Sequence, residues 1–357
     1  MKALQQVVPF YFGTQGRELF GCFHEPARKG MRRCSILICQ PVGHEYINSH
    51  RALRQLAARL AEAGFPVLRF DYYGCGDSCG EAVQGSIARW LDDISAAIAA
   101  IRARTGFIPV YVVGLRLGAT LAAMSGIQQD NLAGLVLWDP VVNGKNYWHE
   151  LLSLQKEMLR FRPKPGRLLG PIVLRLTGYA ERARALVPRA FAYGTQNLRI
   201  AVARWRSGMF LLPSERATAR AKLVLRVHGP SSVTACPSSL APAPSPDHQP
   251  VGSFRSRDKH SNTEILGFPV SNMLRTELEE LDLLKVPKKP APRILVVHTT
   301  QTADENCFKD RLVRTEAQVE HRELQAPEIW LPTKDGSLLV PAQVLQSVVS
   351  WICGATS

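Results

Sequence analysis

A pair of glycines four residues apart encloses an arginine in the stretch VYVVGLRLGATLAA, residues 110–123. The apolar run 110–113 predicts a short buried strand, and residues 117–123 predict a helix directly after it. The spacing GLRLG has the form of a strained strand-to-helix turn, G-x-S-x-G, that holds a nucleophilic serine above a sheet. Arg116 stands where that serine would be, and a guanidinium stays protonated and cannot attack a carbonyl carbon.

Two interpretations of Arg116 are open. A helix N-terminus favours anions, and a guanidinium there binds a carboxylate or phosphate through charge-assisted hydrogen bonds. We therefore expect a ligand site formed by five residues around the turn and the neighbouring strand ends: Val42, Gly43, Arg116, Leu117 and Asp139. The alternative is a buried arginine that pairs with a nearby carboxylate of the chain: Glu45, Asp71 or Asp139.

The elements that position this turn follow from hydrophobic periodicity. We predict strands at 7–12, 17–24, 35–40, 65–70, 110–113, 133–138, 293–298 and 319–324. Between them, amphipathic helices are predicted at 50–63, 86–104, 117–123 and 341–352, and residues 41–45 and 71–78 are predicted loops. Apolar strands that alternate with helices predict a mostly parallel sheet with helices on both faces.

The alternation is interrupted at residues 143–292, which hold 24 Lys and Arg against 11 Asp and Glu. Arginine-rich helices are predicted at 146–160, 180–186 and 198–210, with a further helix at 273–284. Residues 226–262 are rich in Ser, Pro and Ala without apolar periodicity, and we predict disorder there. We thus divide the chain into a core, 1–142 and 293–357, and an inserted basic lid, 143–292. The excess charge indicates an anionic ligand or surface, or a solvated basic face.

Three motifs carry a family resemblance: the loop at 41–45, DYYGCGDS at 71–78 and GLRLG at 114–118. Together with the element order they resemble the α/β-hydrolase superfamily, in particular serine-aminopeptidase-like hydrolases with a D-x-x-G-x-G-x-S loop. The stretch from QPVGHEYINS to DYYGCGDS, with GLRLGATLA, is most similar to the hydrolases associated with the exosortase A system of exopolysaccharide-producing bacteria. The resemblance covers residues 35–142 well, residues from 293 onward weakly, and the lid only at LGFPVSNMLRTELEELDLL. It implies about eight strands and a lid before the seventh.

The resemblance also implies a nucleophile, an acid and a histidine in that chain order. Arg116 occupies the nucleophile position, and Asp304 is the acid by analogy. No histidine follows residue 324, and His321 lies inside the last predicted strand. Two of the three triad positions are therefore vacant.

A different nucleophile is the thiol of Cys75, with His44 as its base, if the two side chains meet. The alternative is that Cys75 is a small side chain in a glycine-rich turn and His44 orders its own loop. The eight cysteines form no C-x-x-C pair. We accordingly expect no metal, no disulfide and no cofactor.

Two functions follow. One is a hydrolase or acyltransferase of an ester, thioester or amide with an unusual nucleophile. The other is a non-catalytic protein that binds a small-molecule, acyl or other anionic ligand, an anionic membrane surface or a protein partner through Arg116 and the basic lid. Nucleic acid is disfavoured, because aromatic residues do not alternate with the arginines. With no signal peptide and no apolar run of 18 residues, we expect a cytoplasmic protein.

Overall fold

The structure is a computed structural model. It describes residues 6–27, 32–106, 109–129, 132–160, 263–285, 288–299, 303–333, 337 and 339–356. The predicted helices at 180–186 and 198–210 and the predicted disorder at 226–262 lie outside these residues. The division into core and lid stays a prediction.

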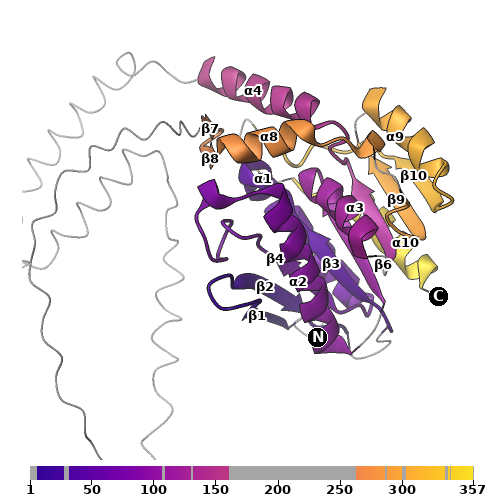
Figure 1. The fold of residues 1–357 in the computed structure, drawn as a ribbon. Helices are drawn as coiled ribbons and strands as arrows, with labels where there is room; N and C mark the ends of the chain where they lie inside the picture. The colour runs from indigo at the N-terminus through magenta and orange to yellow at the C-terminus, as the bar shows by residue number, and fades with distance from the viewer. Residues whose placement is uncertain are drawn as a thin grey trace, which may run out of the picture. The chain divides into compact units, whose positions relative to one another are not determined.

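An eight-stranded sheet in the order β1-β2-β4-β3-β5-β6-β9-β10 organises the described chain (Figure 1). Its strands are β1 (Val7–Phe12), β2 (Leu19–His24), β3 (Ser35–Cys39), β4 (Val67–Phe70), β5 (Val110–Leu115), β6 (Leu132–Trp138), β9 (Arg293–His298) and β10 (Gln318–Glu323). The β1–β2 and β2–β4 pairs are antiparallel and all other pairs are parallel. The predicted fold class, a mostly parallel sheet of the α/β-hydrolase type, is confirmed.

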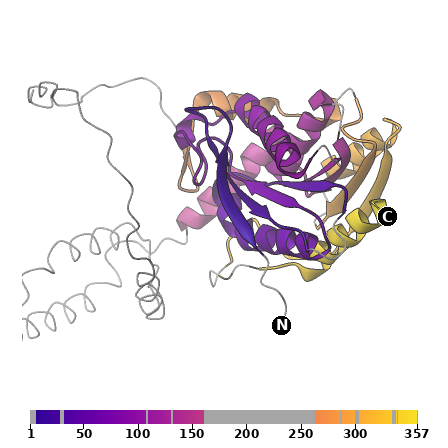
Figure 2. The same ribbon diagram turned by 90° about the horizontal axis from the view of Figure 1, so that it is seen from below.

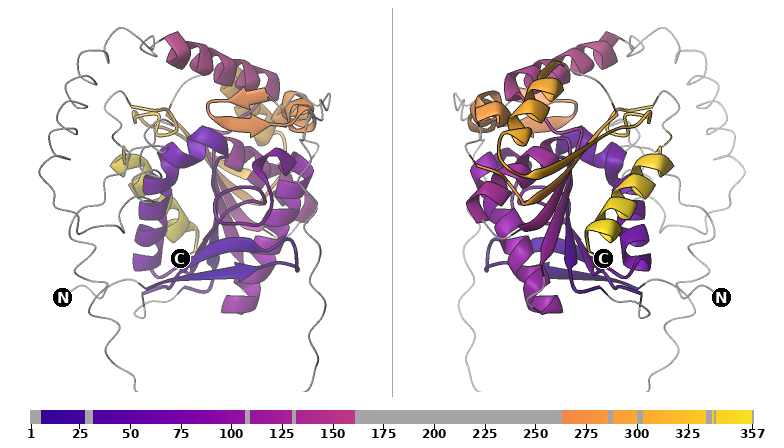
Figure 3. Two further views of the ribbon diagram at one scale, coloured as in Figure 1. Left: turned by 90° about the vertical axis from the view of Figure 1, so that its left-hand side faces the viewer. Right: turned by 90° about the vertical axis from the view of Figure 1, so that its right-hand side faces the viewer.

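Helices cover both faces of the sheet, as Figures 2 and 3 show. On one face α1 (Gly43–Glu62) and α10 (Ala342–Ala355) enclose one buried apolar cluster. On the other face α2 (Ile87–Thr105), α3 (Leu117–Gln129) and α9 (Ala303–Val313) enclose a second. The central strands are buried along their whole length, because parallel strands between two helical layers have no solvent face.

The first helix differs from its predicted bounds. It begins at Gly43, so the predicted loop at 41–45 is mostly helical and the helix includes His44. Two polar residues, Glu45 and Ser49, are buried on its inner face, and the Ser49 hydroxyl donates to the Glu45 carbonyl oxygen. These inward polar positions hide the apolar period on which the prediction depended.

Four elements from the two ends of residues 143–292 lie over the carboxyl ends of the parallel strands, and we call them the cap (Figure 1). They are α4 (Gly144–Arg160), β7 (Thr263–Ile265), β8 (Phe268–Val270) and α8 (Asn272–Glu280). Short 3-10 helices occur at Ala82–Gln84 and Leu283–Lys285. Glu277 of α8 accepts a hydrogen bond from the N–H of Ile87, the first residue of α2, which ties the cap to the core. The β7–β8 hairpin and α9 were not predicted.

Candidate functional site

The turn after β5 has the strained geometry that its two glycines predict. Arg116 has a φ of +53°, in the left-handed region of backbone conformation that residues other than glycine rarely adopt. Its N–H donates to the Trp138 carbonyl oxygen at 2.9 Å. Gly118 packs against the backbone oxygens of Cys39 and Gln40 so closely that a methyl group there would collide with them. The turn therefore places Arg116 between β5 and α3, above the sheet.

The Arg116 guanidinium binds two carboxylates. Its Nε donates to Oε1 of Glu45 at 3.0 Å, and both carboxylate oxygens of Glu150 lie 2.7 Å from its Nη2. The Glu45 side chain is 1% exposed and the Glu150 side chain is 46% exposed. Of the three carboxylates named as alternative partners, Glu45 is the one that pairs with Arg116. The pairing with Glu150, which comes from α4 of the cap, was not predicted.

Two aromatic rings complete the surroundings of Arg116. The guanidinium carbon lies 4.8 Å from the centroid of Trp330 and 5.5 Å from that of Tyr147, distances at which a cation is attracted to a ring face. The Tyr147 hydroxyl donates to the second carboxylate oxygen of Glu45 at 3.0 Å. We call these five residues the Arg116 cluster: Glu45, Arg116, Tyr147, Glu150 and Trp330.

The charges of this cluster hold one another in place. Burial alone would lower the pKa of Arg116, but the carboxylates of Glu45 and Glu150 raise it above its ordinary value. Burial raises the pKa of Glu45, and Arg116 opposes that rise. Burial and the charge of Arg116 lower the pKa of His44 to about 4, so His44 is neutral at pH 7. In the Arg116 cluster one guanidinium therefore faces two carboxylates, and the neighbouring His44 is neutral.

Asp71 and Asp139, the two other predicted partners of Arg116, bind different groups. Asp71 accepts hydrogen bonds from Gln40 and Tyr46. Asp139, with φ of +42°, accepts from the N–H of Thr299 at 2.8 Å and from its hydroxyl at 2.6 Å. Burial raises the pKa of Asp139 to about 6. Asp139 thus fastens the end of β6 to the end of β9.

The remaining predicted ligand residues flank the Arg116 cluster. Val42 is the N-cap residue of α1, and its side chain makes no capping bond. Gly43 has φ of +63° and faces the ring of Phe268 in the cap. Leu117 is fully buried. Their role in binding a ligand stays a prediction.

The residues predicted for catalysis are dispersed. Asp304, in α9, accepts a hydrogen bond from the Asn146 amide at 2.6 Å. His321 lies in β10, as predicted, and its ring is parallel to that of His298 with centroids 6.2 Å apart.

The structure also does not join Cys75 to His44. Burial raises the pKa of the Cys75 thiol to about 12, and the carboxylates of Asp71 and Asp93 add to the rise. Nε2 of His44 is buried without a hydrogen-bond partner in the described part of the chain. Both observations weigh against a thiol nucleophile activated by this histidine.

Among the described residues, no three His, Cys, Asp or Glu side chains are grouped so that they could hold a metal ion. None of the helices described here is both long and apolar enough to cross a membrane.

Part of the sequence matches a known family, and the fold is similar to that of solved structures. Residues 41–185 match the family model described as serine aminopeptidase, S33. Est1E from Butyrivibrio proteoclasticus, solved with ferulic acid, is 14% identical with a TM-score of 0.51, over 97% of this chain and 98% of that one. The Pyrococcus furiosus esterase PF2001 is 11% identical with a TM-score of 0.51, over 99% and 92%. No curated protein matches the sequence. Its sheet order and its turn after β5 are those of the α/β-hydrolase fold, and the family match covers less than half of the chain.

Proposed function

We propose that the chain binds a carboxylate- or phosphate-bearing ligand at Arg116 and does not hydrolyse esters through a serine nucleophile at this turn. The observation that carries the proposal is the Glu150 carboxylate, whose two oxygens both lie 2.7 Å from Nη2 of Arg116. An anion of the chain itself occupies the place where an external anion would bind. The proposed ligand displaces Glu150 from the guanidinium.

Glu150 is the exchangeable partner because of where it lies. Its side chain is about half exposed and belongs to the cap, whereas Glu45 is enclosed and is also bonded to Tyr147. An external carboxylate in place of Glu150 leaves the local charge unchanged. Displacement of Glu45 would leave a buried charge unpaired, at a cost of several kcal/mol. The net positive charge of residues 143–292 favours the approach of an anion.

The proposal includes a degenerate triad. Arg116 has no electron pair to donate at physiological pH. The Asp304 carboxylate binds Asn146, and His321 lies inside a strand beside His298. The acid by analogy and the histidine of the last strand therefore contact other side chains, and neither is bonded to Arg116.

A second candidate function is hydrolysis of an ester, thioester or amide with an unusual nucleophile, which is one of the two functions predicted from the sequence. The match of residues 41–185 to the serine aminopeptidase S33 family favours it. A link to exopolysaccharide and exosortase systems is proposed from the sequence resemblance of residues 35–142 alone. The nucleophile of this candidate would be Cys75, whose raised pKa of about 12 opposes thiolate formation at pH 7.

Thermal unfolding with inorganic phosphate or citrate, against sodium chloride of equal ionic strength, tests the first candidate. A ligand that binds only the folded state stabilises it, by about 2.7 kcal/mol at one hundred times its Kd. We expect these anions to raise the Tm of the wild type and Arg116→Met to abolish the rise. Glu150→Gln removes the carboxylate that competes with the added anion for Arg116, so this variant is expected to show a larger rise in Tm.

Glu157→Gln is the matched control, because Glu157 is an exposed carboxylate of the same helix. It is expected to behave as the wild type. Equal protection in the Glu150 and Glu157 variants would refute displacement of Glu150. Fluorophosphonate labelling that maps to a serine would refute the non-catalytic proposal, and thiol labelling at Cys75 that requires His44 would favour the second candidate.

A further inference from the structure

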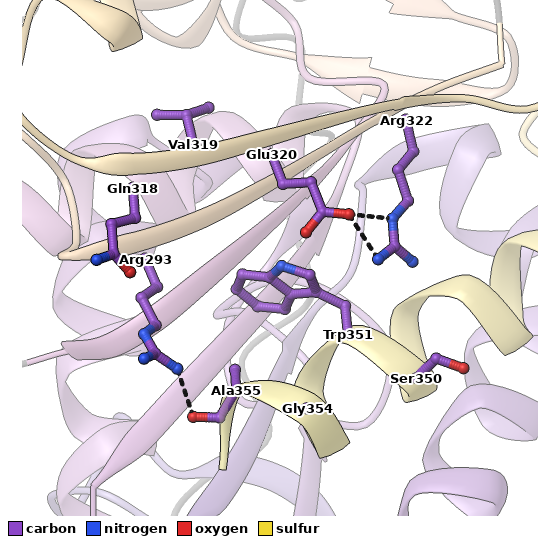
Figure 4. A pocket seen from close by; sticks show the side chains of 9 residues that line it. All are labelled: Arg293, Gln318, Val319, Glu320, Arg322, Ser350, Trp351, Gly354 and Ala355. Carbon is purple, nitrogen blue, oxygen red and sulfur yellow. Dashed lines mark hydrogen bonds and ion pairs between the residues drawn. The ribbon is translucent and has the colours of Figure 1, made fainter. Parts of the chain in front are cut away.

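A second site lies between the edge strand β10 and helix α10. A cavity of about 410 Å³ opens there, and Figure 4 shows the side chains that line it. Arg293 and Gln318 are the first residues of β9 and β10. Near the other end of β9, Val297 pairs with Trp138, whose carbonyl oxygen accepts a hydrogen bond from the Arg116 N–H. Six residues of strand span roughly 17 Å. This β10–α10 pocket is therefore separate from the Arg116 cluster.

One wall of the pocket comes from alternate residues of β10. Gln318, Glu320 and Arg322 share one face of the strand, while Val319 points to the other (Figure 4). Arg322 binds the Glu320 carboxylate at 2.7 Å through Nε and the Ser347 hydroxyl at 2.8 Å through Nη1. The charges of Glu320 and Arg322 are thus satisfied by each other.

Arg293 provides the unbalanced charge of this pocket. Its side chain is exposed, and its Nη1 donates to the carbonyl oxygen of Ala355 at 2.7 Å. Within the described ranges, no carboxylate lies at ion-pair distance from this guanidinium. A guanidinium has five N–H donors in a plane, so donors remain for a bound anion.

Trp351 provides the apolar surface. Its indole lies between Arg293 on one side and the Glu320–Arg322 pair on the other (Figure 4). Tyr111 meets it edge-to-face, with centroids 6.2 Å apart, so the indole is held in place. A Cβ atom added at Gly354, on the same helix, would meet no atom within 4 Å. The floor beside the indole is therefore open backbone.

We propose that the β10–α10 pocket binds a planar aromatic ring that carries one carboxylate or phosphate group. The ring packs on Trp351, and the anionic group takes the unused donors of Arg293. The cavity volume falls within the range of about 300–1,000 Å³ that is usual for small-molecule sites. The inference is independent of the ligand proposed for Arg116.

The test is an NMR titration with benzoate and phenyl phosphate as probes. The readout is the indole N–H signals of the six tryptophans. Trp351→Phe assigns the Trp351 signal. We expect that signal to shift saturably with either probe. Arg293→Gln is expected to weaken the affinity at least about tenfold, because it removes a charge-assisted contact. Arg314→Gln, in the exposed turn before β10, is the matched control and should bind as the wild type.

Two comparisons keep the test decisive. Cyclohexanecarboxylate has the charge without the flat ring, and equal affinity for it would overturn the aromatic part of the proposal. Absence of a saturable Trp351 shift with both probes, or unchanged affinity in Arg293→Gln, would overturn the site itself. Arg293→Lys keeps a charge at this position and is expected to retain part of the affinity, which separates loss of charge from loss of structure.

Discussion

Arg116 and Arg293 lie at opposite ends of the parallel sheet, and their guanidinium groups have very different surroundings. Arg116 follows β5, is 8% exposed and contacts two carboxylates and two aromatic rings. Arg293 begins β9, is exposed, and among the described residues donates to the carbonyl oxygen of Ala355. One arginine is part of the folded core and the other belongs to an open pocket.

A structural arginine differs from one that is free to bind a ligand in how its charge is compensated. A buried guanidinium must be neutralised, and Glu45 does this for Arg116 from inside the protein. Only the Glu150 contact can then be exchanged for an external group. Arg293 needs no such compensation because water solvates it, so its donors cost little to use.

The largest expected effect tests this contrast directly. Arg116→Met leaves the Glu45 carboxylate buried without its cation, and loss of one partner of a buried pair costs about 3–5 kcal/mol. Arg293→Met is expected to change the free energy of unfolding by less than about 1 kcal/mol, since it is exposed. Denaturant unfolding of both variants measures the difference.

A second substitution shows whether the cost comes from Glu45. In the Arg116→Met background, Glu45→Gln removes the unpaired charge and is expected to recover about 1 kcal/mol or more. If Arg116→Met costs as little as Arg293→Met, or if Glu45→Gln has the same effect in both backgrounds, the two arginines do not differ as described.

The next largest expected effect is a loss of stability when Gly118, in the turn after β5, is replaced by alanine. Gly118→Ala places a methyl group against the carbonyl oxygens of Cys39 and Gln40, which belong to backbone and cannot rotate away. Overpacking of this kind costs about 1–3 kcal/mol, and we expect the upper end of that range. Thermal unfolding measures it. A Tm equal to that of the wild type would mean that β3 and α3 are not packed as closely as described.

Most of the fold could be predicted from the sequence. The apolar strands and amphipathic helices of the core have strong periodicity, and the sheet has the predicted eight strands. The predictions failed where that signal is weak. The start of α1 was missed because Glu45 and Ser49 point inward, and β7 and β8 are only three residues long. Short hairpins and inward polar residues carry little periodicity.

Of the site, the sequence predicted the strained turn and the arginine, and it named Glu45 as one of three candidate partners. It did not predict Glu150, Tyr147 or Trp330, which approach Arg116 from α4 and from the segment after β10. Spacing along the chain cannot show which distant side chains meet. The one available signal was that Tyr147 and Glu150 are three residues apart and therefore share a helix face.

The free energy of unfolding is expected to depend on pH, because Asp139 is a buried acid at the Arg116 end of the sheet. Burial raises the pKa of Asp139 to about 6, so the folded protein keeps a proton that the unfolded chain has released between about pH 4 and 6. Stability from this group is therefore present at low pH and is lost as pH rises through that window, by roughly 2–3 kcal/mol at most. The buried histidines His24, His44 and His321, whose pKa values burial lowers to about 4, contribute with the opposite sign. Asp139→Asn is therefore expected to make stability fall less, or rise more, with pH than in the wild type.

Asp93 provides the control for that measurement. Burial also raises its pKa to about 6, so it titrates in the same window and maintains part of the slope in Asp139→Asn. The double variant with Asp93→Asn is expected to change the slope further in the same direction. Because Asp139→Asn also weakens the contact with Thr299, the slope against pH and not the absolute stability is the quantity to compare. An unchanged slope in Asp139→Asn would mean that Asp139 titrates normally.

The smallest expected effect is a gain in stability, opposite in sign to the loss expected for Gly118→Ala, and it concerns Gly354 at the other end of the sheet. Gly354→Ala is the same chemical change as Gly118→Ala, but the added methyl group of residue 354 meets no atom within 4 Å. Because alanine favours the helical conformation more than glycine does, the variant is expected to be more stable by about 0.5 kcal/mol near the end of α10.

The same methyl group would project beside Trp351, so we expect benzoate to bind the β10–α10 pocket less tightly even though the fold is more stable. Denaturant unfolding and the Trp351 titration measure the two quantities separately. A loss of stability of more than about 1 kcal/mol would show that the floor of the pocket is not open, and unchanged benzoate affinity would place the aromatic ring away from Gly354.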